Sequence, residues 1–315
     1  MTIEGRTRRR IAWAILALLG VGSVCAAASN PFLRGVERPN TVLNIAHAGA
    51  SSLAPQNTLV AGRLAFETGA DVWGVDARLM KDGVFVLMHD ATLDRTTDVE
   101  ELFPTRAPWS VEAFTLDEIR RLDAGSWFAE EDPFGEIEAG NVGPSELSAY
   151  AGEPVPTLCE ALRFVAEHRW LIDVEIKPTE GIDREEVARN LLALIEETGT
   201  AERVMVSSFD HGILRAIKDL EPAIPIGALS IFAPLDPLAY LNDLRADVYL
   251  PSLVGFTEAL LEELRDAGIG VHLWTYNAEE QLERLAHTPG VTGITTDYPQ
   301  RLEAVLERLR HDESE

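Results

Sequence analysis

Residues 46–98 read AHAGASSLAPQNTLVAGRLAFETGADVWGVDARLMKDGVFVLMHDATLDRTTD, and this stretch decides the interpretation of the whole chain. An apolar run leads into it and predicts a strand that stops at His47. A loop follows, and residues 57–68 predict a helix that ends at Gly69. The stretch therefore begins with a strand that ends in a histidine, a loop and a helix.

Two apolar runs, 72–80 and 84–88, then flank the sequence Lys-Asp-Gly at 81–83. Asp-Gly between two such runs is a strong hairpin signal, because glycine tolerates the positive φ that a tight turn needs. A turn centred between the aspartate and the glycine places Asp76 opposite His89. A carboxylate and an imidazole then lie together on the side of the sheet where the first histidine ends its strand.

Strands and helices alternate strictly from residue 156 onward. Further strands are predicted at 171–176, 204–207, 226–229, 248–250, 270–275 and 291–295, each followed by a helical stripe of apolar residues. Strict alternation predicts an α/β fold with parallel packing, and the count favours a closed (β/α)8 TIM-type barrel over residues 41–310. Nine strand candidates are one more than a barrel needs. One of them must be irregular or lie outside the barrel, because a Lys-Asp-Gly connection joins antiparallel strands.

The least regular part of the chain is an insertion after the strand that ends at His89, over residues 91–155. It is rich in proline and acidic residues and contains several large aromatic residues, among them Phe103, Trp109, Trp127 and Phe128. Thr115 and Glu118 form a capping-box pattern that predicts a helix at 116–122. Two interpretations remain open here: a lid over a functional site, or a packed surface excursion.

The chain has 315 residues and a formal net charge of −25, which argues against nucleic acid or an anionic membrane as a bulk partner. The N-terminus has the opposite character. Four arginines before residue 11 precede an apolar run and Ala26-Ala27-Ala28, a pattern typical of a secretory leader over residues 1–28. The sequence thus predicts export to the periplasm or the exterior. If the leader is retained, residues 11–28 would tether the protein to a membrane.

A second informative motif, Asp173-Val174-Glu175-Ile176-Lys177, lies on the predicted strand at 171–176. Alternation places the aspartate, the glutamate and the lysine on one face of this strand. Three charges on the inner face of a barrel are costly unless they are paired or bind an ion. A structural salt bridge and a functional site are the two readings. The second is favoured because active groups of barrels lie at the C-terminal strand ends, where two histidines also end their strands.

Six short motifs carry a resemblance to a known family. They are His47-Ala48-Gly49, Pro55-Gln56-Asn57-Thr58, Gly74-Val75-Asp76, Lys81-Asp82-Gly83, His89-Asp90 and Arg95-Thr96-Thr97. In order and spacing they resemble the glycerophosphodiester phosphodiesterases, whose pattern is His-Arg-Gly, Pro-Glu-Asn-Thr, Glu-x-Asp, Lys-Asp-Gly, His-Asp and Arg-Thr-Thr. The resemblance covers about residues 45–306.

The resemblance implies metal-assisted hydrolysis of a glycerophosphodiester to glycerol 3-phosphate and an alcohol. His47 and His89 are implied as the acid and base, and Asp76 and Glu175 as ligands of a divalent cation, Mg²⁺ or Ca²⁺. The implied partner is a small phosphodiester or a lipid head group. The substrate contacts implied are Lys177, Asn57 and Trp274. For Trp274, core packing near a strand end is the alternative, and Ser207-Ser208-Phe209 and Thr296-Asp297 match family positions without an assigned role.

The chain departs from the family pattern at three positions. Ala48 replaces an arginine, Gln56 a glutamate and Gly74 a metal-binding glutamate. Loss of these charges weakens the expected metal and phosphate sites together. A phosphodiesterase with a depleted site is the favoured reading, and a catalytically weak or inactive head-group-binding protein is the alternative. A lysophospholipase D-like enzyme is a further alternative, with an apolar mouth supplied by the aromatic residues of the 91–155 insertion.

Overall fold

The computed structural model describes residues 30–37, 41–178, 181, 183–252 and 256–312, so the predicted leader or anchor at 1–28 lies outside the described residues. The strands are β1 Leu43–His47, β2 Val72–Leu79, β3 Phe85–Leu87, β4 Leu171–Ile176, β5 Val204–Ser208, β6 Ile226–Ser230, β7 Val248–Pro251, β8 Gly270–Leu273 and β9 Gly293–Thr296. The helices around them are α2 Leu59–Glu67, α7 Leu158–His168, α8 Arg184–Thr198, α9 His211–Leu220, α10 Pro237–Leu244, α11 Glu258–Asp266, α12 Glu279–Ala286 and α13 Pro299–Asp312.

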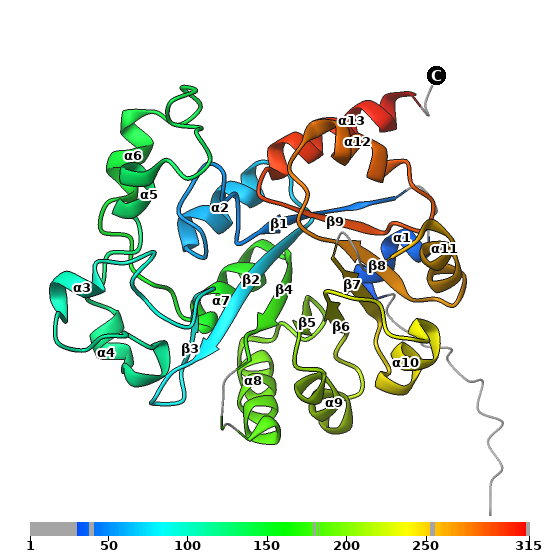
Figure 1. Cartoon of the computed structure of the whole chain (residues 1–315), viewed down its shortest axis with the longest axis horizontal. Helices are drawn as coiled ribbons and strands as arrows, with labels where there is room; N and C mark the ends of the chain where they lie inside the picture. The colour runs from blue at the N-terminus through cyan, green and yellow to red at the C-terminus, as the bar shows by residue number, and fades with distance from the viewer. Residues whose placement is uncertain (1–29, 38–40, 179–180, 182, 253–255, 313–315) are drawn as a thin grey trace, which may run out of the picture.

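Eight of these strands form a closed parallel barrel with helices around it, as Figure 1 shows. The ring closes because β1 pairs in parallel with β2 on one side and with β9 on the other. The predicted (β/α)8 fold is therefore confirmed. Among the described strands, β3 pairs with β2 alone, in antiparallel fashion, and is the ninth strand that lies outside the ring.

The predicted register of the β2–β3 hairpin is wrong by one residue. Ala77 pairs with Leu87, so Met88 rather than His89 lies opposite Asp76, and the Met88 N–H donates to the Asp76 carbonyl at 2.9 Å. The reason is the turn, which uses three residues and has Gly83 at φ +80°. Lys-Asp-Gly is compatible with this three-residue turn as well as with the two-residue turn assumed from sequence.

The N-terminal segment closes the bottom of the barrel. The short helices η1 Pro31–Leu33 and α1 Arg34–Glu37 carry Phe32, which is fully buried. Phe32 packs in one cluster with Leu43, Val72 and Leu171, which lie at the N-terminal ends of their strands. The end of the barrel opposite the C-terminal strand ends is thus filled by apolar side chains.

The insertion forms five short elements at one side of the barrel, beside β3 and α2 (Figure 1). They are α3 Val99–Leu102, η2 Val111–Ala113, α4 Leu116–Ile119, α5 Ser126–Glu131 and α6 Pro144–Tyr150. The predicted capping box between Thr115 and Glu118 is present, and its helix is one turn long. Phe114 and Phe128 are fully buried in apolar clusters that the insertion shares with the β2–β3 hairpin and with α2. Of the two interpretations, a packed excursion describes the insertion better than a lid.

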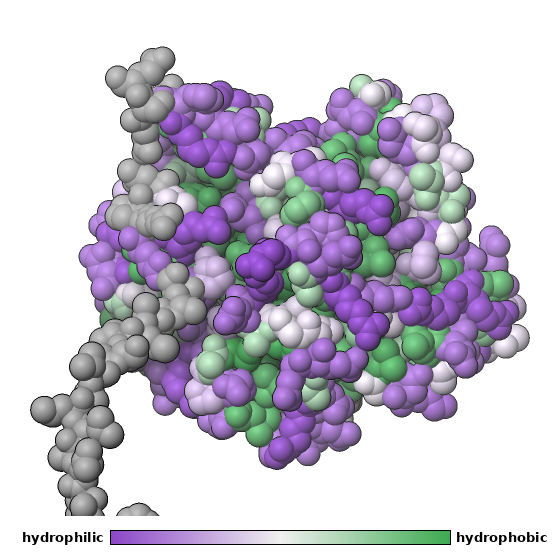
Figure 2. Space-filling model, turned by 180° about the vertical axis from the view of Figure 1, so that it is seen from behind, coloured by the Kyte–Doolittle hydropathy of each residue, from purple (hydrophilic) through white to green (hydrophobic). Residues whose placement is uncertain are grey.

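The surface is mainly polar. Figure 2 shows one face of the molecule, on which hydrophilic residues predominate and apolar residues occur in smaller groups between them. Within the described ranges, none of the helices is both long enough and apolar enough to span a bilayer.

Candidate active site

A cavity of about 180 Å³ opens at the C-terminal ends of the barrel strands. Six of the seven predicted site residues line it, namely His47, Asp76, His89, Glu175, Lys177 and Trp274. They come from distant parts of the sequence, and the closure of the barrel brings them together. Gly74 and Asp173 also line the cavity and pair with each other across β2 and β4.

His47 is held by a carboxylate at the end of the last barrel strand. Its Nδ1 lies 2.7 Å from Asp297 Oδ1, and Asp297 also accepts hydrogen bonds from Ser51 and Asn277 at 3.0 and 2.6 Å. Burial opposes the charged form of His47, but the Asp297 carboxylate, with help from Asp76, raises its pKa above the ordinary value. With Nδ1 engaged, Nε2 is the nitrogen left for chemistry in the cavity.

The sequence named Asp297 only as a position matching the family, without a role. Nothing in the local sequence links it to His47, because the two residues are 250 positions apart and meet only when β1 pairs with β9. Ser51 and Asn277 carried no sequence signal at all.

His89 follows β3 and has its own carboxylate partner. Its Nδ1 lies 2.7 Å from Asp90 Oδ1, and Asp90 in turn pairs with Arg95. The buried Arg78 guanidinium donates to the His89 carbonyl oxygen at 2.9 and 3.1 Å. These contacts hold His89 at the cavity although it does not pair with Asp76 across the hairpin.

Asn57 lies behind Asp76 and is the one predicted site residue that does not line the cavity. Its amide nitrogen donates to Asp76 Oδ2 at 2.7 Å, and its amide oxygen accepts from the Asp76 backbone N–H at 3.0 Å. The nitrogen and the oxygen of the Asn57 side-chain amide are thus both hydrogen-bonded to Asp76. The predicted contact of Asn57 with substrate stays a prediction, while the observed contact is one that positions the carboxylate.

Lys177 joins the two carboxylates that were predicted as metal ligands. Its Nζ lies 2.8 Å from Asp76 Oδ1 and 2.6 Å from Glu175 Oε1, and all three side chains are largely buried. Burial disfavours the Lys177 ammonium, yet the two carboxylates raise its pKa above the ordinary value. Burial would raise the pKa of Asp76, but the ammonium brings it well below its usual range. Burial and the Asp76 carboxylate raise the pKa of Glu175, although Lys177 acts against this rise. The cluster is therefore a triad in which one ammonium contacts two carboxyl groups.

Asp173 lies one layer deeper in the barrel than Glu175. Its Oδ1 is buried and has no hydrogen-bond partner among the described residues. Burial raises the pKa of Asp173 to about 7, against a hydrogen bond with Ser207 that lowers it. Unlike Asp76, this carboxyl group has no cation in contact with it.

An apolar wall faces the charged groups across the cavity. Trp274 packs edge-to-face on Phe209 with their ring centroids 5.7 Å apart, and its indole N–H donates to the Leu250 carbonyl at 2.8 Å. The expectation that the insertion's aromatic residues form the apolar mouth is wrong. None of the described residues of 91–155 lines this cavity, because those aromatic side chains pack in clusters between the insertion and the neighbouring β2–β3 hairpin and α2.

A sequence model of the glycerophosphoryl diester phosphodiesterase family matches residues 47–301 of this chain. The chain belongs to the glycerophosphoryl diester phosphodiesterase family. A glycerophosphodiester phosphodiesterase of Caldanaerobacter subterraneus subsp. tengcongensis is 34% identical over 264 residues, covering 82% of this chain and 96% of that protein. One from Bacillus subtilis is 31% identical over 271 residues, covering 83% of this chain and 85% of that protein.

Solved structures agree with this family assignment. A protein from Silicibacter pomeroyi DSS-3 has a TM-score of 0.77 and 26% identity, covering 89% of this chain and 98% of its own. A phosphodiesterase from Oleispira antarctica, solved with the product sn-glycerol-3-phosphate, has a TM-score of 0.71 and 27% identity, covering 84% and 96%.

Glycerophosphoryl diester phosphodiesterases generally use a divalent cation, and the donor set here does not fit one as it stands. Across the described residues, no three His, Cys, Asp or Glu side chains are grouped so as to hold a metal ion. Gly74 offers no donor, and the ammonium of Lys177 contacts both remaining carboxylates. Mg²⁺ and Ca²⁺ take six or more oxygen ligands, so an ion could use Asp76 and Glu175 only after displacing Lys177.

Proposed function

We propose that this protein hydrolyses a glycerophosphodiester to sn-glycerol 3-phosphate and an alcohol. The observation that carries the proposal is the pair His47 and His89, which line one cavity and each present Nδ1 to a carboxylate. Such pairing orients the imidazole and leaves Nε2 available for proton transfer. The product bound by the Oleispira antarctica phosphodiesterase supports the choice of substrate class.

The chemistry requires two proton transfers. One histidine takes a proton from water while the water oxygen forms a new bond to phosphorus. The bond between phosphorus and the alcohol oxygen breaks, and the other histidine gives its proton to that oxygen. Lys177, the one lysine or arginine among the described residues lining the cavity, supplies positive charge beside the phosphate oxygens. Trp274 and Phe209 offer an apolar surface to the rest of the substrate.

The test is release of glycerol 3-phosphate from glycerophosphocholine, glycerophosphoethanolamine and glycerophosphoinositol by the purified protein. Separate arms contain EDTA, Mg²⁺ or Ca²⁺, so that the cation expected from the family is examined directly. We expect release from at least one substrate, and we expect His47→Ala to lower kcat/KM by about 100-fold or more, the usual loss for a general acid or base. His287→Ala is the matched control, since His287 is exposed, is not among the residues that line the cavity, and has its Nδ1 bonded to the Glu283 carbonyl.

A different result would support the head-group-binding protein. In that case folded protein releases no glycerol 3-phosphate in any arm, while glycerol 3-phosphate still raises its Tm. A Tm increase that Lys177→Met abolishes would then locate binding without turnover in the same cavity.

A lysophospholipase D-like activity is the second candidate, and one observation favours it. The loop after β6 exposes three large apolar residues, Ile231, Phe232 and Leu235, at the end of the barrel where the cavity opens. Phe232 is 74% exposed, and an acyl chain would cover such a surface. A lysophospholipid arm in the same assay separates the candidates. Phe232→Asp should lower turnover of the lysophospholipid and leave glycerophosphodiester turnover unchanged.

We also propose that the protein is exported through residues 1–28, on the strength of the basic and apolar pattern of that segment. Cell fractionation with N-terminal sequencing of the mature protein tests this. A mature chain that begins near residue 29 indicates a cleaved leader, and an intact N-terminus in the membrane fraction indicates an anchor.

A further inference from the structure

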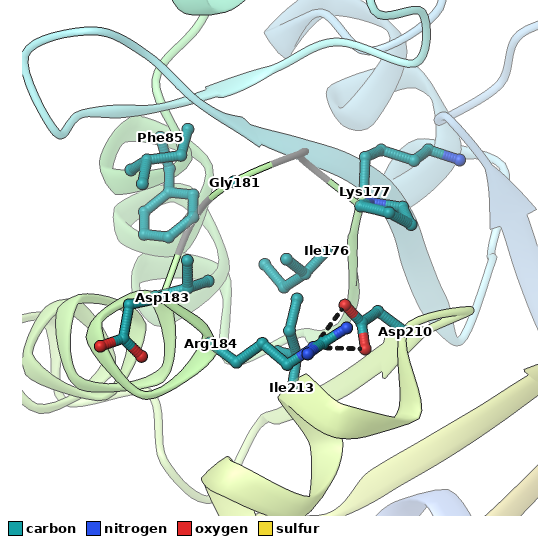
Figure 3. A pocket seen from close by; sticks show the side chains of 11 residues that line it. Phe85, Ile176, Lys177, Gly181, Asp183, Arg184, Asp210 and Ile213 are labelled. Atoms are coloured by element: carbon teal, nitrogen blue, oxygen red, sulfur yellow. Dashed lines mark hydrogen bonds and ion pairs between the residues drawn. The ribbon is translucent and has the colours of Figure 1, made fainter.

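The Lys177 ammonium occupies the place between the two carboxylates that a divalent cation would need. It lies within 2.8 Å of both Asp76 and Glu175, and its side chain is only 9% exposed. A larger cavity of about 650 Å³ borders the same residue, lined also by Arg184 and Asp210. Figure 3 shows the ammonium pointing away from Arg184 and Asp210, which pair with each other. The Lys177 ammonium therefore lies in the cavity at the C-terminal strand ends and not in the larger cavity beside it.

The backbone fixes this arrangement. Asp76 and Glu175 are direct partners in the β2–β4 ladder, and the Lys177 N–H continues that ladder to the Ala77 carbonyl at 3.0 Å. Asn57 holds Asp76 from behind through the nitrogen and the oxygen of its side-chain amide. Asp76 and Glu175 thus stand on two adjacent paired strands, and Lys177 directly follows one of them and is bonded to the other, which gives the triad a defined geometry.

The charge balance of the cluster favours the ammonium over a divalent ion. Two buried carboxylates side by side need a compensating cation, and a buried charge left alone is costly. With no carboxylate at Gly74, the triad sets one ammonium against only two carboxyl groups. A divalent ion would have to displace an ammonium that already satisfies both carboxylates, and the cavity wall at Gly74 offers it no third ligand.

We propose that Lys177 is the built-in cation of this site and performs the electrostatic task for which the family generally uses a divalent ion. The inference rests on the proposed phosphodiester hydrolysis and adds that the reaction here proceeds without bound Mg²⁺ or Ca²⁺. The ammonium lies in the cavity between the carboxylates and the space left for the phosphate, where its charge stabilises the phosphate oxygens during displacement. No additional group is needed to balance the two proton transfers between water, the histidines and the leaving oxygen.

Two measurements on the whole protein test the proposal. The first is turnover after dialysis against EDTA, which we expect to stay within about twofold of turnover in Mg²⁺ or Ca²⁺. The second is calorimetric titration with MgCl₂ and CaCl₂, in which we expect no one-to-one binding that Asp76→Asn removes. Activity lost in EDTA and restored by either ion would overturn the proposal, as would a stoichiometric site that depends on Asp76.

Substitution of Lys177 provides the loss-of-function arm. Lys177→Met keeps most of the length of the side chain and removes its charge, and we expect kcat/KM to fall at least about 100-fold without rescue by added cation. Lys218→Met is the matched control, because Lys218 is also a buried lysine paired with a carboxylate, Asp247, at 2.8 Å. Full activity of Lys177→Met in EDTA would contradict the proposal.

Gly74→Glu provides the gain-of-function arm and stays informative even if Lys177→Met does not fold. A Cβ at Gly74 would lie 3.3 Å from the Ala46 carbonyl oxygen, a tight contact that a small adjustment relieves. The added carboxylate gives a third oxygen ligand, and we expect Mg²⁺ or Ca²⁺ to bind at least about 10-fold more tightly than to the wild type. Equal binding by both proteins would count against the importance of Gly74.

The titrations also keep the two proposals distinguishable. If no substrate is hydrolysed in any arm, the proposed function fails, whereas the comparison of wild type with Gly74→Glu still reports whether Lys177 or a divalent ion neutralises Asp76 and Glu175. If hydrolysis occurs and depends on a divalent ion, only the inference about Lys177 fails.

Discussion

The two histidines of the cavity differ in the setting of their carboxylate partners. Asp297, the partner of His47, is largely buried and is held by Ser51 and Asn277. Asp90, the partner of His89, follows it directly in the chain and is shared with Arg95. A buried carboxylate acts on its imidazole with less screening by solvent, so Asp297 has a strong influence on the pKa of His47.

Asp297→Asn should move the limb of the pH–rate profile that belongs to His47 to lower pH. The carboxylate raises the pKa of His47 against the effect of burial, and a neutral amide removes this favourable charge. The direction is the same whether His47 acts as acid or base. The measurement is kcat/KM between pH 5 and 9 for wild type and variant.

Asp90→Asn serves as the comparison, since it leaves the His47–Asp297 pair in place. We expect the His47 limb of this second variant to coincide with that of the wild type. A limb that stays fixed in Asp297→Asn would show that the pair does not set the titration of His47.

At the scale of secondary structure, alternating apolar patterns were sufficient to predict the barrel, because each β/α unit repeats the same local signal. The hairpin register was not predictable in the same way. A three-residue turn with Gly83 in the left-handed region and a two-residue turn share the sequence Lys-Asp-Gly, and the choice shifts every cross-strand partner by one. The site still forms, because His89 lies beyond the end of β3 and is held through its carbonyl by Arg78.

The candidate site was predicted where its residues belong to local motifs and was missed where it depends on closure of the barrel. Glu175 lies on β4 and Lys177 directly follows that strand two residues later, so their proximity follows from alternation. Contact between His47 and Asp297 requires the β1–β9 pairing, which no local pattern encodes. The insertion was also difficult to interpret, because its aromatic residues give no sign of whether they face a cavity or one another.

A substitution in η1 should lower the stability of the protein without changing its activity. Phe32→Ala removes a fully buried ring from the bottom of the barrel and should lower the free energy of unfolding by about 3–5 kcal/mol. The value of kcat/KM under folding conditions should not change, because Phe32 lies at the opposite end of the barrel from the cavity. Urea unfolding and the phosphodiesterase assay measure the two quantities.

The control is Phe232→Ala at an exposed position, which should cost less than about 0.5 kcal/mol of unfolding free energy. If Phe32→Ala lost activity while keeping wild-type stability, the bottom of the barrel would have to influence the cavity by a route that the packing does not show.

For the molecule as a whole, stability should depend on pH through His272. Burial lowers the pKa of His272 to about 4, although its ring N–H donates to the Phe32 carbonyl at 3.2 Å. In the unfolded chain His272 binds a proton near pH 6.5, whereas in the folded state it binds one only near pH 4. The free energy of unfolding is therefore unaffected by this group above pH 6.5, and it decreases by about 3 kcal/mol in total as the pH falls from about 6.5 to about 4.

The measurement is urea unfolding of wild type and His272→Leu at several pH values between 7 and 4. The unfolding free energy of the wild type should fall relative to that of His272→Leu as the pH falls, because only the wild type carries the cost of keeping His272 uncharged. His287→Leu, at an exposed position, should follow the wild type throughout. Parallel curves for wild type and His272→Leu would contradict the prediction.

The chain enters the barrel at Asn30, on the face that Phe32 closes, and the catalytic opening lies on the other face. This polarity matters for any protein that keeps residues 11–28 as an anchor. Such an anchor would attach the blunt underside of the barrel to the bilayer and leave the opening directed outward, into the aqueous compartment. An enzyme mounted in this way samples solutes that diffuse past it, and it reaches lipids only in a membrane that faces it.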